Sequence, residues 1–234
     1  MTSPTPVTHV LFDMDGLLLD TERVYSEVTS EILARYGKTF SWEVKSQMMG
    51  AKERDAAEIL VSHYAIPLTP EEYLVERNAM HEARFPLCKP LPGVQRFVQH
   101  LHRHKVPMCV ATSSHRRAFE LKSKNNQSLF SLFGDKVTCG DDALIKRGKP
   151  APDIFLAGAH SLGVPLEADH VSCLVFEDAP SGVMAGLAAG CQVIWIPDVN
   201  LALDPALVAK CARVLKSMED FNPVEFGLPA YEDN

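Results

Sequence analysis

Short, almost continuously apolar segments recur along the chain, separated by longer stretches whose apolar residues repeat at helical spacing. Strands of a parallel sheet that is covered by helices on both faces read in this way, because neither of their faces meets water. Strands that alternate with helices imply right-handed crossovers and therefore an α/β fold with a parallel sheet. The predicted strands are residues 9–13, 106–112, 136–140, 172–178 and 191–197.

One long segment interrupts this alternation. Residues 20–88 contain helical patterns and no convincing strand. Thr69 and Glu72 have the spacing of a capping box, which predicts that a helix starts there. We expect this segment to lie over the carboxyl edge of the sheet, where ligands bind in open α/β folds. The predicted domains are an α/β core of residues 1–18 and 90–234 and an inserted, all-helical cap of residues 19–89.

Charged and hydroxyl side chains follow the predicted strands. Asp13 and Asp15 come at the end of the first strand, two residues apart, so their side chains can point the same way. Taken alone, this pair could equally cap a turn and the helix after it. Further polar groups favour a functional site over a cap, because they follow other strands and the carboxyl ends of parallel strands meet at one edge of the sheet. The groups expected there are Thr112, Ser113, Ser114, Lys149, Glu177 and Asp178.

This combination of side chains suits a phosphoryl group. Clustered carboxylates repel one another unless a cation holds them, and Mg²⁺ accepts an oxygen-only set of ligands. Lys149, the hydroxyl of Thr112 and nearby backbone N–H groups can bind phosphate oxygens. One carboxylate is then available to attack phosphorus, while a second can protonate the leaving oxygen and later take a proton from water.

Four segments, in this order, resemble the motifs of the haloacid dehalogenase superfamily: LFDMDGLLLDTE, ATSS, GKPAPDIF and VFEDAPSGV. The resemblance implies a Rossmann-like core with a mobile helical cap. It implies that Asp13 is the nucleophile and Asp15 the acid and base, and that Thr112, Ser113 and Lys149 bind the phosphoryl group. The Mg²⁺ ligands that it implies are Asp13, the backbone carbonyl of Asp15, Asp178, and Glu177 directly or through water.

The activity that the resemblance implies is Mg²⁺-dependent hydrolysis of a phosphomonoester through an aspartyl-phosphate, with a nucleoside 5′-monophosphate as substrate. A sugar-phosphate phosphatase or phosphomutase of the same superfamily is an alternative, although mutases tend to carry a cap histidine in a neighbourhood that here reads DTERVYSEV, with Tyr25 and no histidine. A different class is a phospho-acceptor signalling module, since receiver domains resemble the same set of Asp, Thr and Lys. Residues expected to influence substrate specificity are Thr21, Glu22, Met49 and Ser114.

The charge, the apolar segments and the cysteines of the chain indicate which kinds of partner and compartment to expect. A net charge of −7 over 234 residues argues against a nucleic acid polymer or an anionic membrane as partner. No apolar segment approaches the length of a membrane span, and the N-terminus lacks the pattern of a signal peptide. The six cysteines form no CxxC pair and lie mostly in apolar runs, which suits a reducing, cytoplasmic compartment. We expect a monomer that acts on a small phosphorylated substrate.

The segment HLHRH, residues 100–104, contains a histidine cluster. His100 and His104 share a helix face, so a metal-binding pair is conceivable. They lie on the polar side of a predicted core helix, away from the expected sheet edge. We therefore predict a solvated face.

Overall fold

The computed structural model describes residues 4–48 and 53–232. The chain forms two compact units: the first comprises Met1–Asp20 and Lys89–Asn234, and the second comprises Thr21–Cys88. These boundaries lie one or two residues from those predicted for the core and the cap. The helical insertion is therefore a unit with internal packing of its own.

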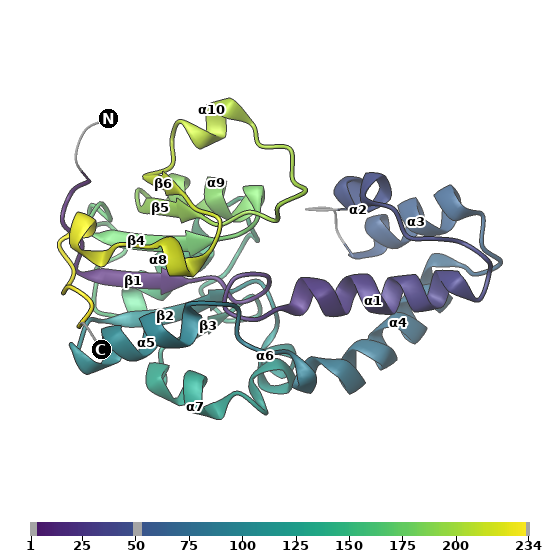
Figure 1. Ribbon diagram of the computed structural model, residues 1–234, viewed down its shortest axis with the longest axis horizontal. Helices are drawn as coiled ribbons and strands as arrows, with labels where there is room; N and C mark the ends of the chain where they lie inside the picture. Colours follow the sequence, from purple (N-terminus) through teal and green to yellow (C-terminus); the bar gives the residue numbers. More distant parts are fainter. Residues whose placement is uncertain (1–3, 49–52, 233–234) are drawn as a thin grey trace. The chain divides into compact units, whose positions relative to one another are not determined.

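The first unit is built on a six-stranded parallel sheet with the strand order β3-β2-β1-β4-β5-β6 (Figure 1). The chain winds outward from β1 in both directions, so the order reverses between β1 and β4. Ligands bind at such a reversal, beyond the carboxyl ends of the strands. Phe12 pairs with Val110 of β2 on one side and with Phe176 of β4 on the other. The strands are β1 His9–Phe12, β2 Met108–Thr112, β3 Val137–Cys139, β4 Cys173–Glu177, β5 Gln192–Trp195 and β6 Arg213–Val214.

The five predicted strands and the α/β fold are confirmed, whereas β6 was not predicted. With two residues, β6 is too short for a hydrophobic pattern to indicate it. The helical elements of this unit are α5 Val94–Arg103, α6 Arg116–Ser123, α7 Gln127–Phe130, η2 Ser131–Phe133, α8 Asp153–Ser161, α9 Pro180–Ala188, α10 Pro205–Val208, η3 Met218–Asp220 and η4 Pro223–Phe226.

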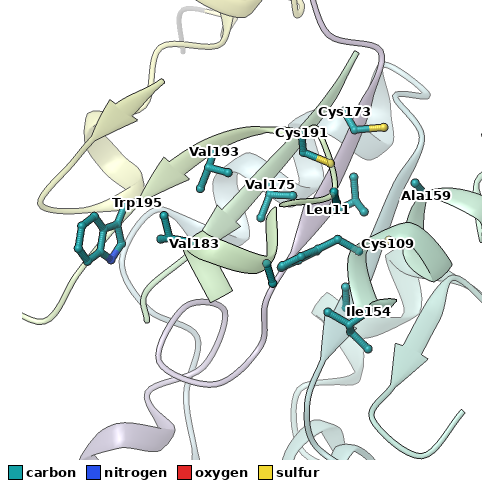
Figure 2. Packing of buried hydrophobic residues seen from close by; sticks show 14 of the residues in the cluster. Leu11, Cys109, Ile154, Ala159, Cys173, Val175, Val183, Cys191, Val193 and Trp195 are labelled. Carbon is teal, nitrogen blue, oxygen red and sulfur yellow. The ribbon is translucent and has the colours of Figure 1, made fainter. Parts of the chain in front are cut away.

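One face of the sheet packs against α8 and α9. Figure 2 shows Leu11, Val175 and Val193 of three strands in one cluster with Ile154 of α8 and Val183 of α9. Full burial of an aliphatic side chain of this size contributes about 1.5–3 kcal/mol. Three cysteines pack in the same cluster as small apolar side chains, as predicted: Cys109, Cys173 and Cys191.

The opposite face carries an aromatic cluster. Phe12 of β1 and Phe176 of β4 stack with ring centroids 5.2 Å apart, and Phe97 of α5 meets Phe12 edge-on at 5.8 Å. Phe221 lies 4.9 Å from both Phe97 and Phe176. Because both faces of the central strands are closely packed, the residues that follow their carboxyl ends have little freedom to shift.

One histidine of the cluster differs from the prediction, while His102 and His104 are exposed as expected. His100 is buried rather than solvated, and its Nε2 lies 2.9 Å from the carbonyl oxygen of Pro229. The ring of Tyr231 packs against it at 4.8 Å. The C-terminal tail therefore covers a helix face that is polar in sequence.

In the second unit, the regular elements among the described residues are all helices. The predicted capping box is confirmed: the N–H of Thr69 donates to Glu72 Oε2 at 2.8 Å, and the N–H of Glu72 donates to Thr69 Oγ1 at 3.2 Å. A buried hydrogen bond of 3.3 Å between the hydroxyls of Thr29 and Tyr73 joins α1 to α4. None of the helices in residues 4–48 and 53–232 is long and apolar enough to cross a lipid bilayer. The elements are α1 Thr21–Ala34, α2 Trp42–Met48, α3 Glu53–Tyr64, α4 Pro70–Arg84 and η1 Phe85–Leu87.

Candidate active site

Asp13 and Asp15 lie in the turn that follows β1. The N–H of Asp13 donates to the carbonyl oxygen of Phe176 at 3.0 Å, which continues the pairing with β4 beyond the strand end. Gly16 has a φ of 78°, so the chain can reverse directly behind Asp15. The N–H of Gly16 then donates to the carbonyl oxygen of Leu19 at 3.0 Å. Both carboxylates therefore start from the carboxyl edge of the sheet.

Asp13 belongs to a buried cluster with Lys149 and Glu177. Lys149 Nζ donates to Asp13 Oδ1 and, at 2.6 Å, to Glu177 Oε1. The side chains of Asp13, Lys149 and Glu177 are 7%, 9% and 1% exposed. Burial raises the pKa of Asp13 to about 7 against the opposing charge of Lys149. Burial alone would lower the pKa of Lys149, but the two carboxylates outweigh it and raise that pKa, so the lysine stays charged.

Glu177 is held from its other side by the backbone at the start of α9. Its Oε2 accepts hydrogen bonds of 2.9 Å from the N–H groups of Asp178 and Ala179. Gly182 approaches so closely that a Cβ at this position would lie 1.6 Å from Glu177 Oε1. Both oxygens of Glu177 have partners within the protein, so this carboxylate holds Lys149 and the Asp178 loop in place.

Asp178 adds a third carboxylate. One oxygen each from Asp13, Glu177 and Asp178 lies within 4.8 Å of the others. Trp195 Nε1 donates to the backbone carbonyl of Asp178 at 2.8 Å, which anchors this loop to β5. Carboxylates at such spacing repel one another unless a cation offsets their charge, and an all-oxygen set fits Mg²⁺. A bound cation would also favour the ionised form of Asp13.

The end of β2 adds hydroxyl groups. Thr112 is buried, and its Oγ1 accepts the N–H of Ser114 at 3.0 Å and lies 3.4 Å from Asp15 Oδ2. Ser113 is exposed, but its backbone is tightly packed: a Cβ at Gly140 would lie 2.3 Å from its carbonyl oxygen. This close approach of the loop after β3 defines the path of the chain at the residues predicted to bind phosphate.

Lys122, in α6, is a site residue that the sequence reasoning missed. Its side chain is 1% exposed, and its Nζ donates to Asp15 Oδ1 at 2.6 Å and to Ser114 Oγ at 2.8 Å. A signal was present in the sequence. Lys122 follows Ala118 by four positions and Phe119 by three, so it falls on the apolar stripe of its helix, where lysine is uncommon.

The residues expected to influence specificity are divided between the two units. Ser114 belongs to the first unit, where its hydroxyl donates to Asp15 Oδ2 at 2.8 Å. Thr21 and Glu22 belong to the second unit. Thr21 is buried, and Glu22 forms an ion pair of 3.0 Å with Lys45. Met49 lies outside the described residues.

Comparison with known proteins agrees with this geometry. Residues 10–196 match the family model of the haloacid dehalogenase-like hydrolases. A probable pseudouridine-5′-phosphatase of Drosophila melanogaster is 46% identical over 227 residues, covering 97% of this chain and 96% of the relative. (DL)-glycerol-3-phosphatase 2 of Arabidopsis thaliana is 46% identical over 231 residues, covering 97% and 94%. The crystal structure of a HAD family hydrolase from Deinococcus radiodurans R1, with bound phosphate and sodium, matches with a TM-score of 0.81 at 25% identity, over 97% of this chain and 100% of that one. The chain is thus a phosphatase that belongs to the haloacid dehalogenase-like hydrolase family.

Proposed function

We propose that this phosphatase hydrolyses a phosphomonoester with Mg²⁺ as cofactor and Asp13 as nucleophile, and that the substrate is a nucleoside 5′-monophosphate, pseudouridine 5′-phosphate. The observation that carries the proposal is the buried contact of Asp13 with Lys149 inside the acidic cluster. A carboxylate beside a charged ammonium group and a cation site is suited to attack a phosphoryl group that the same charges attract. The choice of substrate rests on the 46% identity with the Drosophila protein.

The reaction has two steps. Asp13 attacks phosphorus and forms an aspartyl-phosphate, while the bond to the leaving oxygen breaks and Asp15 gives that oxygen a proton. Asp15 then takes a proton from a water molecule, whose oxygen attacks the same phosphorus. Inorganic phosphate leaves and the carboxylate of Asp13 is restored. Lys149, Thr112 and Ser113 hold the phosphoryl oxygens during both steps.

The proposed Mg²⁺ ligands are Asp13, Asp178 and the backbone carbonyl of Asp15. When bound, the ion neutralises the negative charge that gathers on the phosphoryl oxygens. For Glu177 we favour a contact through water, because both of its oxygens already accept hydrogen bonds.

The helical unit Thr21–Cys88 is the proposed cap. Caps of this kind close over a bound substrate, exclude water from the first step and reopen for product release. Substrate recognition is assigned to Thr21, Glu22 and Met49 of the cap, together with Ser114 of the core.

Glycerol 3-phosphate is a second candidate substrate, because the Arabidopsis glycerol-3-phosphatase is as similar to this chain as the Drosophila protein is. A phosphomutase is less well supported. The segment where mutases tend to carry a histidine has none here, and its Tyr25 packs its ring 4.8 Å from His81 and 5.5 Å from Phe85. The ring therefore has a packing role within the helical unit.

A panel of phosphate esters tests the proposal. Phosphate release is measured with pseudouridine 5′-phosphate, uridine 5′-monophosphate, glycerol 3-phosphate and glucose 6-phosphate, each with Mg²⁺ and with excess EDTA. We expect the highest kcat/KM for pseudouridine 5′-phosphate and no turnover in EDTA. A higher kcat/KM for glycerol 3-phosphate would make that compound the substrate in place of pseudouridine 5′-phosphate. Full turnover in EDTA would contradict the proposal that Mg²⁺ is the cofactor. Isomerisation of glucose 6-phosphate without phosphate release would select the mutase, and a phosphoprotein that lasts for minutes in Mg²⁺ would select the signalling module.

A further inference from the structure

A closed ring of hydrogen bonds surrounds the carboxylate of Asp15. Lys122 donates to Oδ1 at 2.6 Å, Ser114 donates to Oδ2 at 2.8 Å, and Lys122 also donates to the Ser114 hydroxyl at 2.8 Å. Each oxygen of Asp15 therefore has its own donor. The carboxylate cannot rotate about its terminal torsion without losing one of these bonds, so Lys122 and Ser114, with Thr112 Oγ1 at 3.4 Å from Oδ2, restrain its orientation.

The position of Lys122 is costly for a charged group. Its side chain is 1% exposed, and a methionine would fill similar space without removing a charge from water. Asp15 is different: its side chain keeps 22% exposure, so water can solvate its charge without help from a lysine. Folding alone therefore gives little reason for a lysine here, whereas the contact with Asp15 does.

The remaining contacts tie this arrangement to the phosphate side of the site. The N–H of Ser114 donates to Thr112 Oγ1 at 3.0 Å, and Asn126 Nδ2 donates to the backbone carbonyl of Lys122 at 3.3 Å. Lys122 therefore links α6 to the turn after β1 and to the end of β2. A displacement of its ammonium group would move Asp15 relative to the residues proposed to hold the phosphoryl group.

We propose that Lys122 is a positioning residue which, together with Ser114, holds the carboxyl group of Asp15 in the orientation from which it protonates the leaving oxygen. This inference rests on the proposed function, in which Asp15 is the acid. Lys122 acts through Asp15 and not on the substrate. Its loss therefore harms substrates whose leaving oxygen needs a proton and spares substrates whose leaving oxygen does not.

The test compares Lys122→Met with the wild-type protein on two esters in Mg²⁺. One is the alkyl phosphate of the panel that the wild type hydrolyses best, and the other is p-nitrophenyl phosphate, whose nitrophenolate leaves without a proton. The measured quantity is kcat/KM, which reports the steps up to the first irreversible one. Release of the alcohol is that step, so the later hydrolysis of the aspartyl-phosphate does not affect the value. We expect a loss of about 100-fold on the alkyl ester and less than about threefold on the nitrophenyl ester, since a general acid contributes 10²–10⁴-fold.

Equal losses on the two esters, or no loss on either, would overturn the proposal. Lys124→Met is the matched control, because Lys124 is exposed at the C-terminal end of α6 and undergoes the same chemical change. We expect it to stay within about twofold of the wild type on both esters, as surface substitutions usually do. In an Asp15→Asn background, Lys122→Met should cause no further loss on the alkyl ester, and a further tenfold loss would contradict action through Asp15.

A second variant covers the case in which Lys122→Met fails to fold, which thermal unfolding monitored by circular dichroism would reveal. Ser114→Ala removes the closer donor to Oδ2, leaves Thr112 Oγ1 at 3.4 Å from that oxygen, and keeps the lysine contact to Oδ1. We expect the same preference for the nitrophenyl ester with a smaller loss, and equal losses would again overturn the proposal. Failure of the proposed function looks different, because Asp15→Asn itself would then lose no more activity on the alkyl ester than on the nitrophenyl ester.

Discussion

The two aspartates of the turn after β1 lie two residues apart, and each contacts a buried lysine, yet their surroundings differ. Asp13 is 7% exposed and shares Lys149 with Glu177, and an oxygen of Asp178 lies within 4.8 Å. Asp15 is 22% exposed and shares its lysine with the hydroxyl of a serine. One carboxylate is surrounded by other acids, and the other by hydrogen-bond donors.

This difference suits two chemical roles. With three carboxylates and one lysine, the acidic cluster has an excess of negative charge that a cation would offset, and burial there raises the pKa of Asp13 to about 7. The donor-rich arrangement holds a single carboxylate in one orientation and needs no further ion. On our proposal the first environment suits a metal-assisted nucleophile and the second a proton donor and acceptor. Environment, and not residue type, separates the two functions.

Replacing Lys149 has the largest expected effect, because it breaks the ion pair with Asp13, the less exposed of the two aspartates. Lys149→Met leaves the buried carboxylates of Asp13 and Glu177 without their shared cation, so we expect a loss of about 3–5 kcal/mol in the free energy of unfolding. Phosphate release should fall by about 10³-fold or more, because a preorganised charge at the phosphoryl group is lost. Urea unfolding and a phosphate-release assay check the two parts. The exposed Lys146, on the same loop, supplies the control variant Lys146→Met, and equal stability of the two variants would contradict the account.

Asparagine substitutions sharpen the comparison between the aspartates. Asp15→Asn leaves the buried ammonium group of Lys122 without its counter-charge, and we expect a loss of about 1–3 kcal/mol in stability. Adding Lys122→Met should restore part of that loss. Burial raises the pKa of Asp13, so its charge is unfavourable in the fold, and Lys149 keeps Glu177 as a partner; in metal-free protein Asp13→Asn should therefore cost less stability than Asp15→Asn. Urea unfolding in EDTA measures all three, and a larger loss for Asp13→Asn than for Asp15→Asn would reverse the comparison.

Gly182→Ala perturbs the acidic cluster through Glu177, whose carboxylate packs against Gly182 of α9. A Cβ at this position would lie 1.6 Å from Glu177 Oε1, so the carboxylate must move and carry Lys149 with it. We expect overpacking to cost about 1–3 kcal/mol of stability. A shift near 1 Å in the site should lower kcat by up to about 100-fold. Gly148→Ala is the control, since a Cβ there meets no atom within 4 Å; indistinguishable variants would mean that Glu177 tolerates displacement.

The smallest expected effect concerns the loop of Asp178. Trp195→Phe removes the hydrogen bond from the indole to the backbone carbonyl of Asp178 and keeps an aromatic ring in the core. One hydrogen bond contributes about 0.5–1.5 kcal/mol, so the apparent Kd for Mg²⁺ should rise by about threefold to tenfold. Isothermal titration with Mg²⁺ measures this change. An unchanged Kd together with lowered stability would show that the indole serves packing only.

Much of the site could be predicted because its residues follow strand ends. Apolar runs that alternate with helical patterns indicate a parallel sheet, and the ends of parallel strands meet at one edge whatever the details of packing. Asp13, Glu177 and Asp178 could therefore be grouped from sequence, and Lys149 joined them because its loop enters the helix beside that edge. Grouping these residues requires only the order of the strands, not the position of any side chain.

Lys122 could not be found in the same way. It is in a helix whose sequence, HRRAFELKSK, looks like a basic, solvated surface, and its burial depends on how α6 packs. His100 was mispredicted for a related reason, since the tail that buries it lies more than a hundred residues further along the chain. In both cases a distant segment covers a polar side chain. Local periodicity places Lys122 on the apolar stripe of its helix, but it does not indicate which segment covers it.

The most direct test of the central claim is to trap the covalent intermediate. The protein is mixed with its best substrate in Mg²⁺, quenched within one turnover, and treated with borohydride, which reduces an aspartyl-phosphate to homoserine. Peptide mass spectrometry then locates the change. The account predicts homoserine at position 13 in the wild type, none in Asp13→Asn, and none without substrate. Reduction at any other carboxylate, or rapid turnover with no reducible intermediate at Asp13, would contradict it.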